Sequence, residues 1–301
     1  MLRRRPLRWM VGVTVALTVL AGACSGDSSE ENPPIVVGSF DFPESEVLGE
    51  LYRLALETAG FPVVHRARIG DRAEVNALMR AGEVDLVPEY LGSALEVTFG
   101  VEPSSDFAES YGLLTDAWLA DGFLVMFPAP AQSQNGFAMT EMQAGMLGVS
   151  VLSDIVAISP DLTFGGPPEC PERPRCLVGL SDTYGIRFGA VTTLDAGGPA
   201  TIQALQDGTV DVGLVFTTDP AVEDGDLLLL GDDLGLQPNE SIVPVLSLDA
   251  AERFGDELLI LLDDISAALE QRAVVALNRA VAAGRSPDDA AEEWLLINGF
   301  E

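Results

Sequence analysis

The residue types that carry most enzymatic chemistry are scarce in this chain. Among its 301 residues every one of the 16 basic side chains is an arginine, and there is one histidine, His65. Without lysine, a Walker-type phosphate loop, a Schiff base and a Ser-Lys pair are excluded. With one histidine, a His-Glu-x-x-His zinc site is impossible, and a Ser-His-Asp triad would have to use His65, which we expect to be a structural or surface residue of a strand. We find no nucleophile beside a base, so the sequence favours a binding protein, without cofactor or metal, over an enzyme.

Two similar segments place an aromatic ring at the same distance after an aspartate, with hydroxyls following the ring. Residues 77–85 and residues 204–211 each end a helix, pass through glycine and enter a strand at Asp85 and Asp211. An aromatic residue follows five positions after each aspartate, and hydroxyls come next. These residues are Tyr90 and Ser93 in the first segment, and Phe216, Thr217 and Thr218 in the second. Ligands of open α/β sheets lie at the carboxyl ends of strands, so the repeat predicts two similar lobes facing one cleft. A coincidence between two common helix–strand turns is the alternative.

The elements around these segments alternate between strand and helix patterns. We expect strands at 35–38, 63–67 and 84–87, and helices at 44–60, 72–80, 103–120, 256–269, 271–283 and 287–298. Ser286 before Pro287 is a strong start signal for the last helix. The alternation predicts an α/β architecture built on parallel sheets.

The first 34 residues carry targeting signals. Arginines near the start precede an apolar run from Trp9 to Leu20, which is typical of a signal peptide and too short to span a membrane comfortably. The run ends in small residues before Cys24 and resembles a bacterial lipoprotein signal. We therefore expect residues 1–23 to be removed and Cys24 to be lipidated, with residues 24–34 as a disordered tether. The protein would then be extracytoplasmic, anchored to the outer face of the cell membrane; an ordinary secretory signal is the alternative.

The net charge limits which partners this chain can bind, and the cysteines indicate the redox state of its cellular compartment. The formal net charge of −31 disfavours nucleic acid and anionic lipid headgroups as partners, while 48% hydrophobic residues indicate a globular chain. Cys170 and Cys176 flank a short loop. In an oxidising compartment we expect a disulfide between them, worth roughly 2–3 kcal/mol, with two free thiols as the alternative.

Six motifs, taken in order, resemble one known family. They are VGSFDFPE at 37–44, DLVPEYLGS at 85–93, FGGPPE at 164–169, TYG at 183–185, FTTD at 216–219 and DDLG at 232–235. Together they resemble the substrate-binding proteins of osmoprotectant ABC importers, over nearly all of residues 35–300. The resemblance implies capture of glycine betaine, choline, carnitine or a related compound and delivery to an ABC permease.

The resemblance also implies the fold. This is the two-lobed periplasmic-binding-protein fold of the second type, with two parallel-sheet lobes, a hinge and a ligand cleft. We place lobe I at residues 35–133 plus 239–301 and lobe II at 134–238, with hinges near 131–135 and 237–241. Closure of the lobes around the ligand is the implied mechanism.

Site residues are carried over from the family motif by motif. Known members hold a quaternary ammonium in a cage of aromatic rings. Cage positions fall on Tyr90, Phe137 and Phe216; as alternatives, the two phenylalanines are ordinary core residues. Ser93 falls where a threonine hydroxyl often contacts the ligand, and Asn135 lies in the expected hinge.

Three further positions complete the predicted site. Arg173 falls on an arginine that binds a ligand carboxylate or ties the lobes together, and pairing with Glu169 or Glu172 is the alternative. Phe40 replaces a common family lysine, and Glu240 replaces a cage tyrosine. Taken alone, Glu240 is most simply a solvated side chain. As part of the site, these departures favour a choline-like cation. A receptor for another polar metabolite such as an amino acid, or an extracytoplasmic enzyme on the same fold, are the competing hypotheses.

Overall fold

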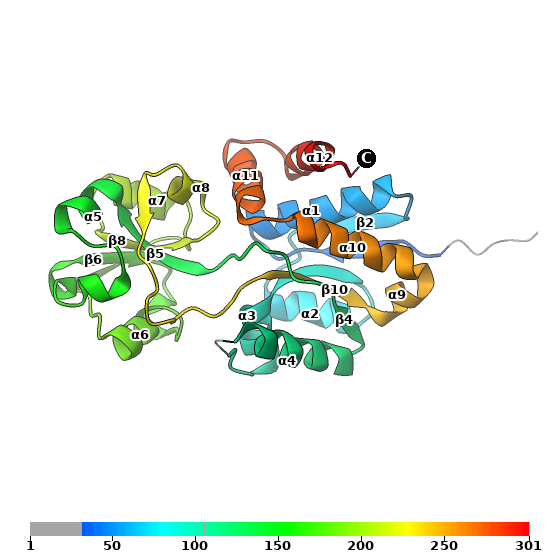
Figure 1. Cartoon of the computed structure of the whole chain (residues 1–301), viewed down its shortest axis with the longest axis horizontal. Coiled ribbons are helices and arrows are strands. Elements are labelled where there is room, and N and C mark those ends of the chain that lie inside the picture. Colours follow the sequence, from blue (N-terminus) through cyan, green and yellow to red (C-terminus); the bar gives the residue numbers. More distant parts are fainter. Residues whose placement is uncertain (1–31, 105, 301) are drawn as a thin grey trace, which may run out of the picture. The chain divides into compact units, whose positions relative to one another are not determined.

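A computed structural model describes residues 32–104 and 106–300 of the chain (Figure 1). The expected signal peptide at 1–23 and the expected lipidation site Cys24 lie outside these residues, as does most of the tether. Within the described part of the chain, no helix is long and apolar enough to cross a membrane.

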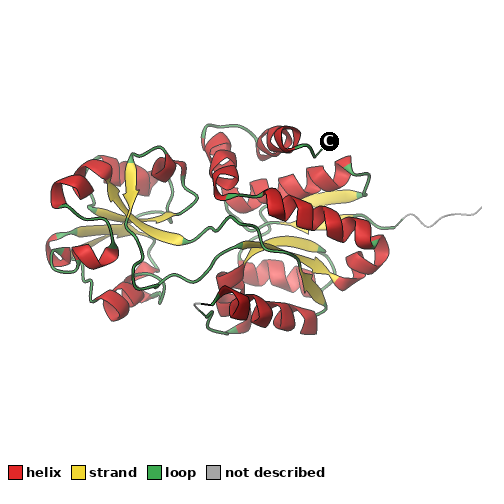
Figure 2. Cartoon of the chain, in the orientation of Figure 1, coloured by secondary structure: helices red, strands yellow, loops and turns green. Residues whose placement is uncertain are grey.

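The first sheet contains five strands. They are β1 (Ile35–Gly38), β2 (Val63–Arg66), β3 (Leu86–Tyr90), β4 (Phe123–Val125) and β10 (Ile242–Ser247), in the order β2-β1-β3-β10-β4. Its main helices are α1 (Pro43–Thr58), α2 (Arg72–Arg80), α4 (Phe107–Ala120), α9 (Leu248–Phe254), α10 (Asp256–Ala268), α11 (Gln271–Ala282) and α12 (Pro287–Asn298). Figure 2 shows helices around the strands of each sheet. Trp118 and Tyr52 are the largest fully buried side chains of the core that this sheet shares with its helices.

The second sheet also contains five strands. They are β5 (Asn135–Thr140), β6 (Thr163–Gly166), β7 (Ala190–Thr193), β8 (Val212–Phe216) and β9 (Leu227–Leu229), in the order β7-β6-β8-β5-β9. Its helices include α5 (Glu141–Leu147), α6 (Leu177–Gly179), α7 (Pro199–Gln206) and α8 (Pro220–Glu223). Phe137 and Phe164 are the largest fully buried side chains of its core.

The two sheets correspond strand for strand, which confirms the internal repeat predicted from the sequence. In the first sheet the Asp85 backbone N–H donates to the Val36 carbonyl (2.8 Å) and its side chain accepts from the Val36 N–H (2.9 Å). In the second, Asp211 makes the same two contacts with Thr163, at 2.8 and 2.7 Å. Each aspartate thus ties its strand to the neighbouring parallel strand, and each strand ends on the aromatic residue of the repeat, Tyr90 or Phe216.

The α/β architecture is as predicted, but both sheets are mixed and not wholly parallel. β1 and β6 pair in parallel with two neighbours each, whereas β10 and β5 run antiparallel to both of theirs. The chain passes from β4 to β5 and returns from β9 to β10. The two strands that receive the chain from the other sheet are therefore the antiparallel ones, an arrangement that local strand–helix alternation does not reveal.

Most expected elements agree with the observed bounds to within a few residues. The last helix spans Pro287–Asn298, and the Ser286 hydroxyl accepts from the Asp289 N–H (3.1 Å), as the start signal predicted. α4 begins at Phe107 instead of 103 because Asp106 caps it, accepting from the Ala108 N–H (2.8 Å). The third strand continues to Tyr90, which places this ring at a strand end.

Candidate functional site

The carboxyl edge of the first sheet brings several predicted site residues together. Residues 39–42 lead from β1 into α1, and Tyr90 ends β3 and leads into α3 (Leu91–Ser93). Arg72 begins α2, and residues 237–241 return from the second sheet toward β10. The predicted residues at this edge are Phe40, Tyr90, Ser93 and Glu240.

Three aromatic rings lie in a row at this edge, and we call this row the aromatic stack. The rings of Phe40 and Phe42 are nearly parallel, with centroids 5.9 Å apart, whereas the rings of Phe42 and Tyr90 are tilted by 37°, with centroids 6.0 Å apart. The Arg72 guanidinium lies 4.9 Å from the Phe40 centroid and occupies that face of the stack. Phe40 and Tyr90 are buried, while Phe42 is 38% exposed. The accessible ring is therefore Phe42, which the sequence reasoning missed although it lies inside the first family motif.

Glu44 is a buried carboxylate that binds three neutral donors. Tyr90 donates its hydroxyl to Oε1 (2.9 Å), and the Thr218 hydroxyl (2.5 Å) and the Asn278 amide (2.6 Å) donate to Oε2. Burial, and then the charge of Glu44, raises the pKa of Tyr90 well above its ordinary value. Because Glu44 belongs to α1 and Thr218 follows β8, the cluster joins elements of both sheets.

Glu44 was also missed, and a sequence signal for it existed. It precedes Val47, Leu48 and Leu51 by three, four and seven positions, so it lies on the buried face of α1. A carboxylate at that position, in the first turn of a helix, is stabilised by the helix dipole. It still requires donors from other elements, and the structure supplies them.

Arg72, which lies over the Phe40 ring, forms an ion pair with Glu89. The Arg72 Nε and Nη2 atoms donate to the Glu89 carboxylate at 3.0–3.1 Å, and Glu89 is fully buried. Glu89 also accepts from the Tyr90 N–H (3.1 Å). The guanidinium is thus held between a carboxylate and the Phe40 ring.

Glu240 is buried, so the expectation of a solvated side chain is wrong. Ser93 donates its N–H to Oε2 (2.9 Å) and its hydroxyl to Oε1 (2.8 Å). Residues 238–239 press directly on the α3 turn, since a Cβ at Gly92 would lie 2.8 Å from Pro238 and 2.9 Å from the Asn239 carbonyl. Glu240, which follows these residues, is 8% exposed. Burial raises the pKa of its carboxyl to about 7, against the opposing effect of the Ser93 hydrogen bonds.

The remaining predicted site residues belong to strands of the second sheet. Asn135 pairs with Phe216 across β5 and β8. Phe216 is half-buried, and its ring lies so close to Gly197 that a Cβ there would be 2.9 Å from it. Phe137 is 1% exposed and its ring centroid is 6.2 Å from that of Phe164, so it packs in the core. The structure does not bring these rings into contact with the stack of the first sheet.

A cavity of about 280 Å³ lies beside the segments that connect the two sheets. Its lining residues are Gln134, Asn135, Gly136, Phe137, Leu152, Thr217, Leu229, Leu230, Gly231, Asp232, Gly235 and Gln237. The Tyr184 hydroxyl donates to Asp232 and accepts from the Leu234 N–H (2.7 Å). Tyr184 therefore supports the wall of this cavity through Asp232.

In the loop at 170–176, Arg175 and not the predicted Arg173 contacts an element of the first sheet. Arg173 is 62% exposed and pairs with Glu169 (3.2 Å), the alternative open at the sequence level. The Arg175 guanidinium is 24% exposed and donates to Glu96 (3.2 Å) and to the Leu236 carbonyl (3.0 Å).

The loop that carries both arginines is closed by its flanking cysteines. Cys170 and Cys176 are joined as a disulfide, with their Cα atoms 5.3 Å apart.

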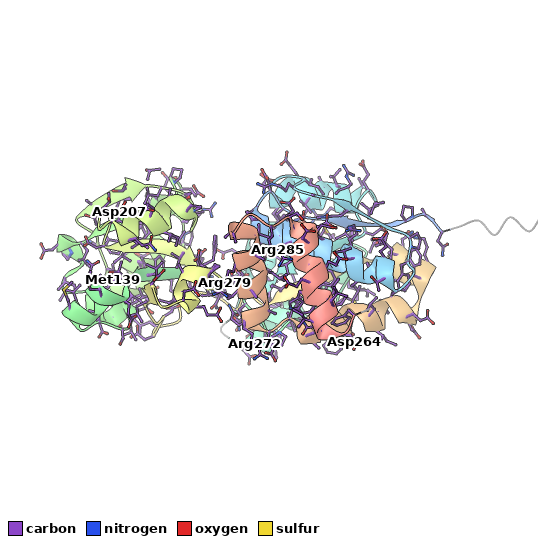
Figure 3. The ribbon with its side chains drawn as sticks, turned by 90° about the horizontal axis from the view of Figure 1, so that it is seen from above. Met139, Asp207, Asp264, Arg272, Arg279 and Arg285 are labelled. Carbon is purple, nitrogen blue, oxygen red and sulfur yellow. A yellow bond between two sulfur atoms is a disulfide. The ribbon has the colours of Figure 1, made fainter. Side chains whose placement is uncertain are left out.

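A second group of ion pairs joins α11 to α8. Arg279 of α11, labelled in Figure 3, pairs with Glu223 (3.0 Å) and Asp224 (2.7 Å) at α8.

His65 has a structural place, as expected. Its Nδ1 lies 2.8 Å from Glu50 and its Nε2 2.9 Å from the Ser39 hydroxyl, and the ring is buried. Across residues 32–104 and 106–300, no group of three or more His, Cys, Asp or Glu side chains is placed to hold a metal ion.

Comparison with known proteins agrees with this arrangement. Residues 33–296 match the model of the substrate-binding domain of ABC-type glycine betaine transport systems. A glycine-betaine-binding protein of Pseudomonas aeruginosa is 30% identical over 256 residues, covering 81% of each chain. The glycine betaine-binding protein YehZ of Escherichia coli is 26% identical over 285 residues, covering 89% of this chain and 91% of that one.

A solved structure shows the same fold. A glycine betaine/carnitine/choline ABC transporter structure superposes with a TM-score of 0.80 at 20% identity, covering 88% of this chain and 99% of the other. The fold is the two-lobed periplasmic-binding-protein fold of the second type, as predicted.

Proposed function

The chain belongs to the family of substrate-binding domains of ABC-type glycine betaine transport systems, and we propose that it captures a quaternary ammonium osmoprotectant of the choline or glycine betaine type. It binds this solute outside the cell and delivers it to a membrane permease. The observation that carries the ligand class is the aromatic stack of Phe40, Phe42 and Tyr90 beside buried carboxylates.

The chemistry of the stack suits a cation that cannot donate hydrogen bonds. A desolvated cation over an aromatic face is worth about 2 kcal/mol or more, and a quaternary ammonium is weakly hydrated and easily transferred from water. Phe42 offers an accessible ring, and Tyr90 has its hydroxyl turned to Glu44, so its ring is held in place. Two relatives are named as glycine betaine-binding proteins, which supports the same class of ligand.

Receptor action requires two lobes that close on the ligand. We assign residues 35–133 plus 239–301 to lobe I and 134–238 to lobe II, with the connecting segments as hinges. Asn135, Phe137 and Phe216 would then complete the site from lobe II. Contacts made to the ligand from both lobes would favour the closed state.

The cell-surface part of the proposal rests on the sequence. Residues 1–23 act as the signal, Cys24 carries the lipid, and residues 24–34 form the tether. The disulfide between Cys170 and Cys176 suits an oxidising compartment outside the cytoplasm. We assign no catalytic activity to the chain.

Titration calorimetry tests this function directly. The mature protein is titrated with choline, glycine betaine, carnitine and proline betaine, and with alanine as a non-quaternary reference. We expect at least one quaternary compound to bind and Phe42→Ala to weaken it roughly tenfold or more. Phe127→Ala is the matched control, because Phe127 is an exposed aromatic residue outside the stack. Absence of binding to every quaternary compound would overturn the ligand class, and chemical turnover of a bound compound, followed by mass spectrometry, would overturn the assignment as a receptor.

A further inference from the structure

One face of α11 binds the segment that follows β8 in the second sheet. The polar residues of this face are Gln271, Asn278 and Arg279, and a spacing of seven and eight positions puts them on one side of a helix. They bind residues 217–224, which run from the end of β8 through α8. α8 packs against α11, and Figure 1 shows the two helices next to each other. We call Gln271, Val275, Asn278 and Arg279 the α11 contact face.

Gln271 lies at the segment that connects the two sheets. Its side-chain oxygen accepts from the Gln132 N–H (2.9 Å), and its amide donates to the carbonyls of Gln132 (3.0 Å) and Thr217 (3.2 Å). Thr217 in turn donates its hydroxyl to the Gln132 carbonyl (3.0 Å). The first turn of α11 is therefore fixed where the chain crosses from one sheet to the other.

Arg279 makes the contact of this face that lies farthest along the helix from the crossing. It pairs with Glu223 (3.0 Å) and Asp224 (2.7 Å) of α8 and its C-terminal end, and the Arg279 side chain is 41% exposed. Arg279 follows Gln271 by eight residues, which is about 12 Å of helix. A rotation of roughly 15° about the connecting segments moves a point at that distance by about 3 Å, enough to break both ion pairs.

The middle of the face is packed. Val275 is 4% exposed, yet it is not part of the first-sheet core to which its neighbour Val274 belongs. Asn278 donates to the Thr218 carbonyl (3.2 Å). Rotation toward α11 would meet these packed side chains. The rotation that remains separates α8 from α11 and breaks contacts that the observed arrangement makes.

The same arrangement brings two strand ends of the proposed site to one carboxylate. Glu44 accepts from the Tyr90 hydroxyl (2.9 Å) at the end of β3, and from the Thr218 hydroxyl (2.5 Å). Thr218 comes two residues after Phe216, where β8 ends. Asn278 donates to the same carboxylate (2.6 Å). The α11 contact face is therefore engaged when the segments that carry Tyr90 and Phe216 meet at Glu44.

Resting on the proposed function, we propose that the α11 contact face holds the two lobes in the ligand-binding arrangement, and that Arg279 slows ligand release without touching the ligand. None of the four residues of the face lines the 280 Å³ cavity or belongs to the aromatic stack. Contacts that are made in the binding-competent arrangement and lost when the lobes separate raise the population of that arrangement. Because part of the contact is an exposed ion pair, salt weakens it.

Substitution Arg279→Gln removes the ion pairs and keeps a long polar side chain. Arg272→Gln is the matched control, because Arg272 is in the same helix, is 80% exposed and pairs with Glu270 instead of a residue of α8. Arg279→Lys keeps the charge and is the conservative variant. Both side chains reach solvent, so we expect every variant to fold, and thermal unfolding verifies this before ligand is added.

Stopped-flow fluorescence measures how fast glycine betaine and choline dissociate. Arg279→Gln should release bound ligand about two- to fivefold faster than the wild type, whereas Arg279→Lys and Arg272→Gln should stay close to the wild-type rate. Raising NaCl from about 50 to about 500 mM should speed release from the wild type and leave Arg279→Gln nearly unchanged. Glycine betaine has no net charge, so this salt effect does not come from the ligand. Equal rates for Arg279→Gln and Arg272→Gln at both salt concentrations would overturn the role of Arg279 while the proposed function stands.

Hydrogen–deuterium exchange of the ligand-free protein tests the contact itself. Arg279→Gln should speed exchange in residues 217–224 and in α11 by about two- to fivefold, and Arg272→Gln should not. Unchanged exchange in residues 217–224 would overturn the proposal. If no quaternary ammonium compound binds, the proposed function is overturned, and the exchange result alone decides whether the α11 contact face joins the lobes.

Discussion

Replacing Thr218 with valine tests whether the hydroxyl of Thr218 holds the buried Glu44 carboxylate in place. Thr218 is buried, and its Oγ1 donates to Glu44 Oε2 at 2.5 Å. Valine has nearly the same shape but no hydroxyl. The change therefore removes one of three donors to Glu44 while Tyr90 and Asn278 remain.

The expected loss follows from the charge and burial of the acceptor. A hydrogen bond to a charged group contributes about 1.5–3 kcal/mol to stability, and more is lost when the acceptor stays buried. Two remaining donors limit that further loss, so we expect the free energy of unfolding to fall by about 2 kcal/mol. For a chain of this size the midpoint of thermal unfolding should fall by roughly 4–8 °C.

Urea unfolding, followed by the fluorescence of the buried Trp118 and Trp294, measures this change. The midpoint should fall while the slope with urea concentration stays constant. Thr193→Val, at an exposed position of β7, is the control and should change stability by less than about 0.5 kcal/mol. A double-mutant cycle with Glu44→Gln isolates the pair. If Thr218→Val behaves like the control, the hydroxyl does not stabilise Glu44 and the reasoning is refuted.

Three further predictions concern the core, the disulfide and pH. Phe137→Ala should lower the free energy of unfolding by about 3–5 kcal/mol, because the ring packs in the core beside Phe164; a loss below 1 kcal/mol in urea unfolding would contradict this. Replacing Cys170 and Cys176 with serine should lower it by about 2–3 kcal/mol, and an equal stability of the reduced and oxidised wild type would contradict this. Burial raises the pKa of Glu240 from 4.5 to about 7, so its contribution to stability is present below pH 4.5 and is lost as the pH rises through 7. The difference in unfolding free energy between wild type and Glu240→Gln should therefore fall by about 3 kcal/mol over that range, and a constant difference would contradict the assignment.

Several features of the fold could be predicted because they depend on neighbours in sequence. The N-cap Ser286 and the apolar spacing in α1 are local, and so is the pair of aspartate-to-aromatic segments ending at Tyr90 and Phe216. The antiparallel placement of β5 and β10 is not local, because it depends on the path of the chain between the two sheets.

The candidate site was also predictable only where it depends on neighbours in sequence. Tyr90, Ser93 and Glu240 were expected in it from the motifs, and the structure brings them to one edge. Phe42 and Glu44 were inside a motif that had been recognised, yet their roles depend on a ring and on donors from distant elements. Arg173 and Arg175 lie two residues apart in one loop, and only the path of that loop makes Arg175 the bridging one.

The sequence by itself determines which catalytic and charged residue types are present, and it shows the repeated α/β units. With no lysine, one histidine and an excess of acids, it excludes most catalytic sites and leaves few cations for any pocket. The tertiary structure alone determines which acidic side chains are buried away from water. Taken alone, Glu240 was expected to be solvated, but it is buried, and both its carboxylate oxygens accept from Ser93 of the turn after β3. Burial depends on packing between segments that are distant in sequence, and here it raises the pKa of the Glu240 carboxyl to about 7.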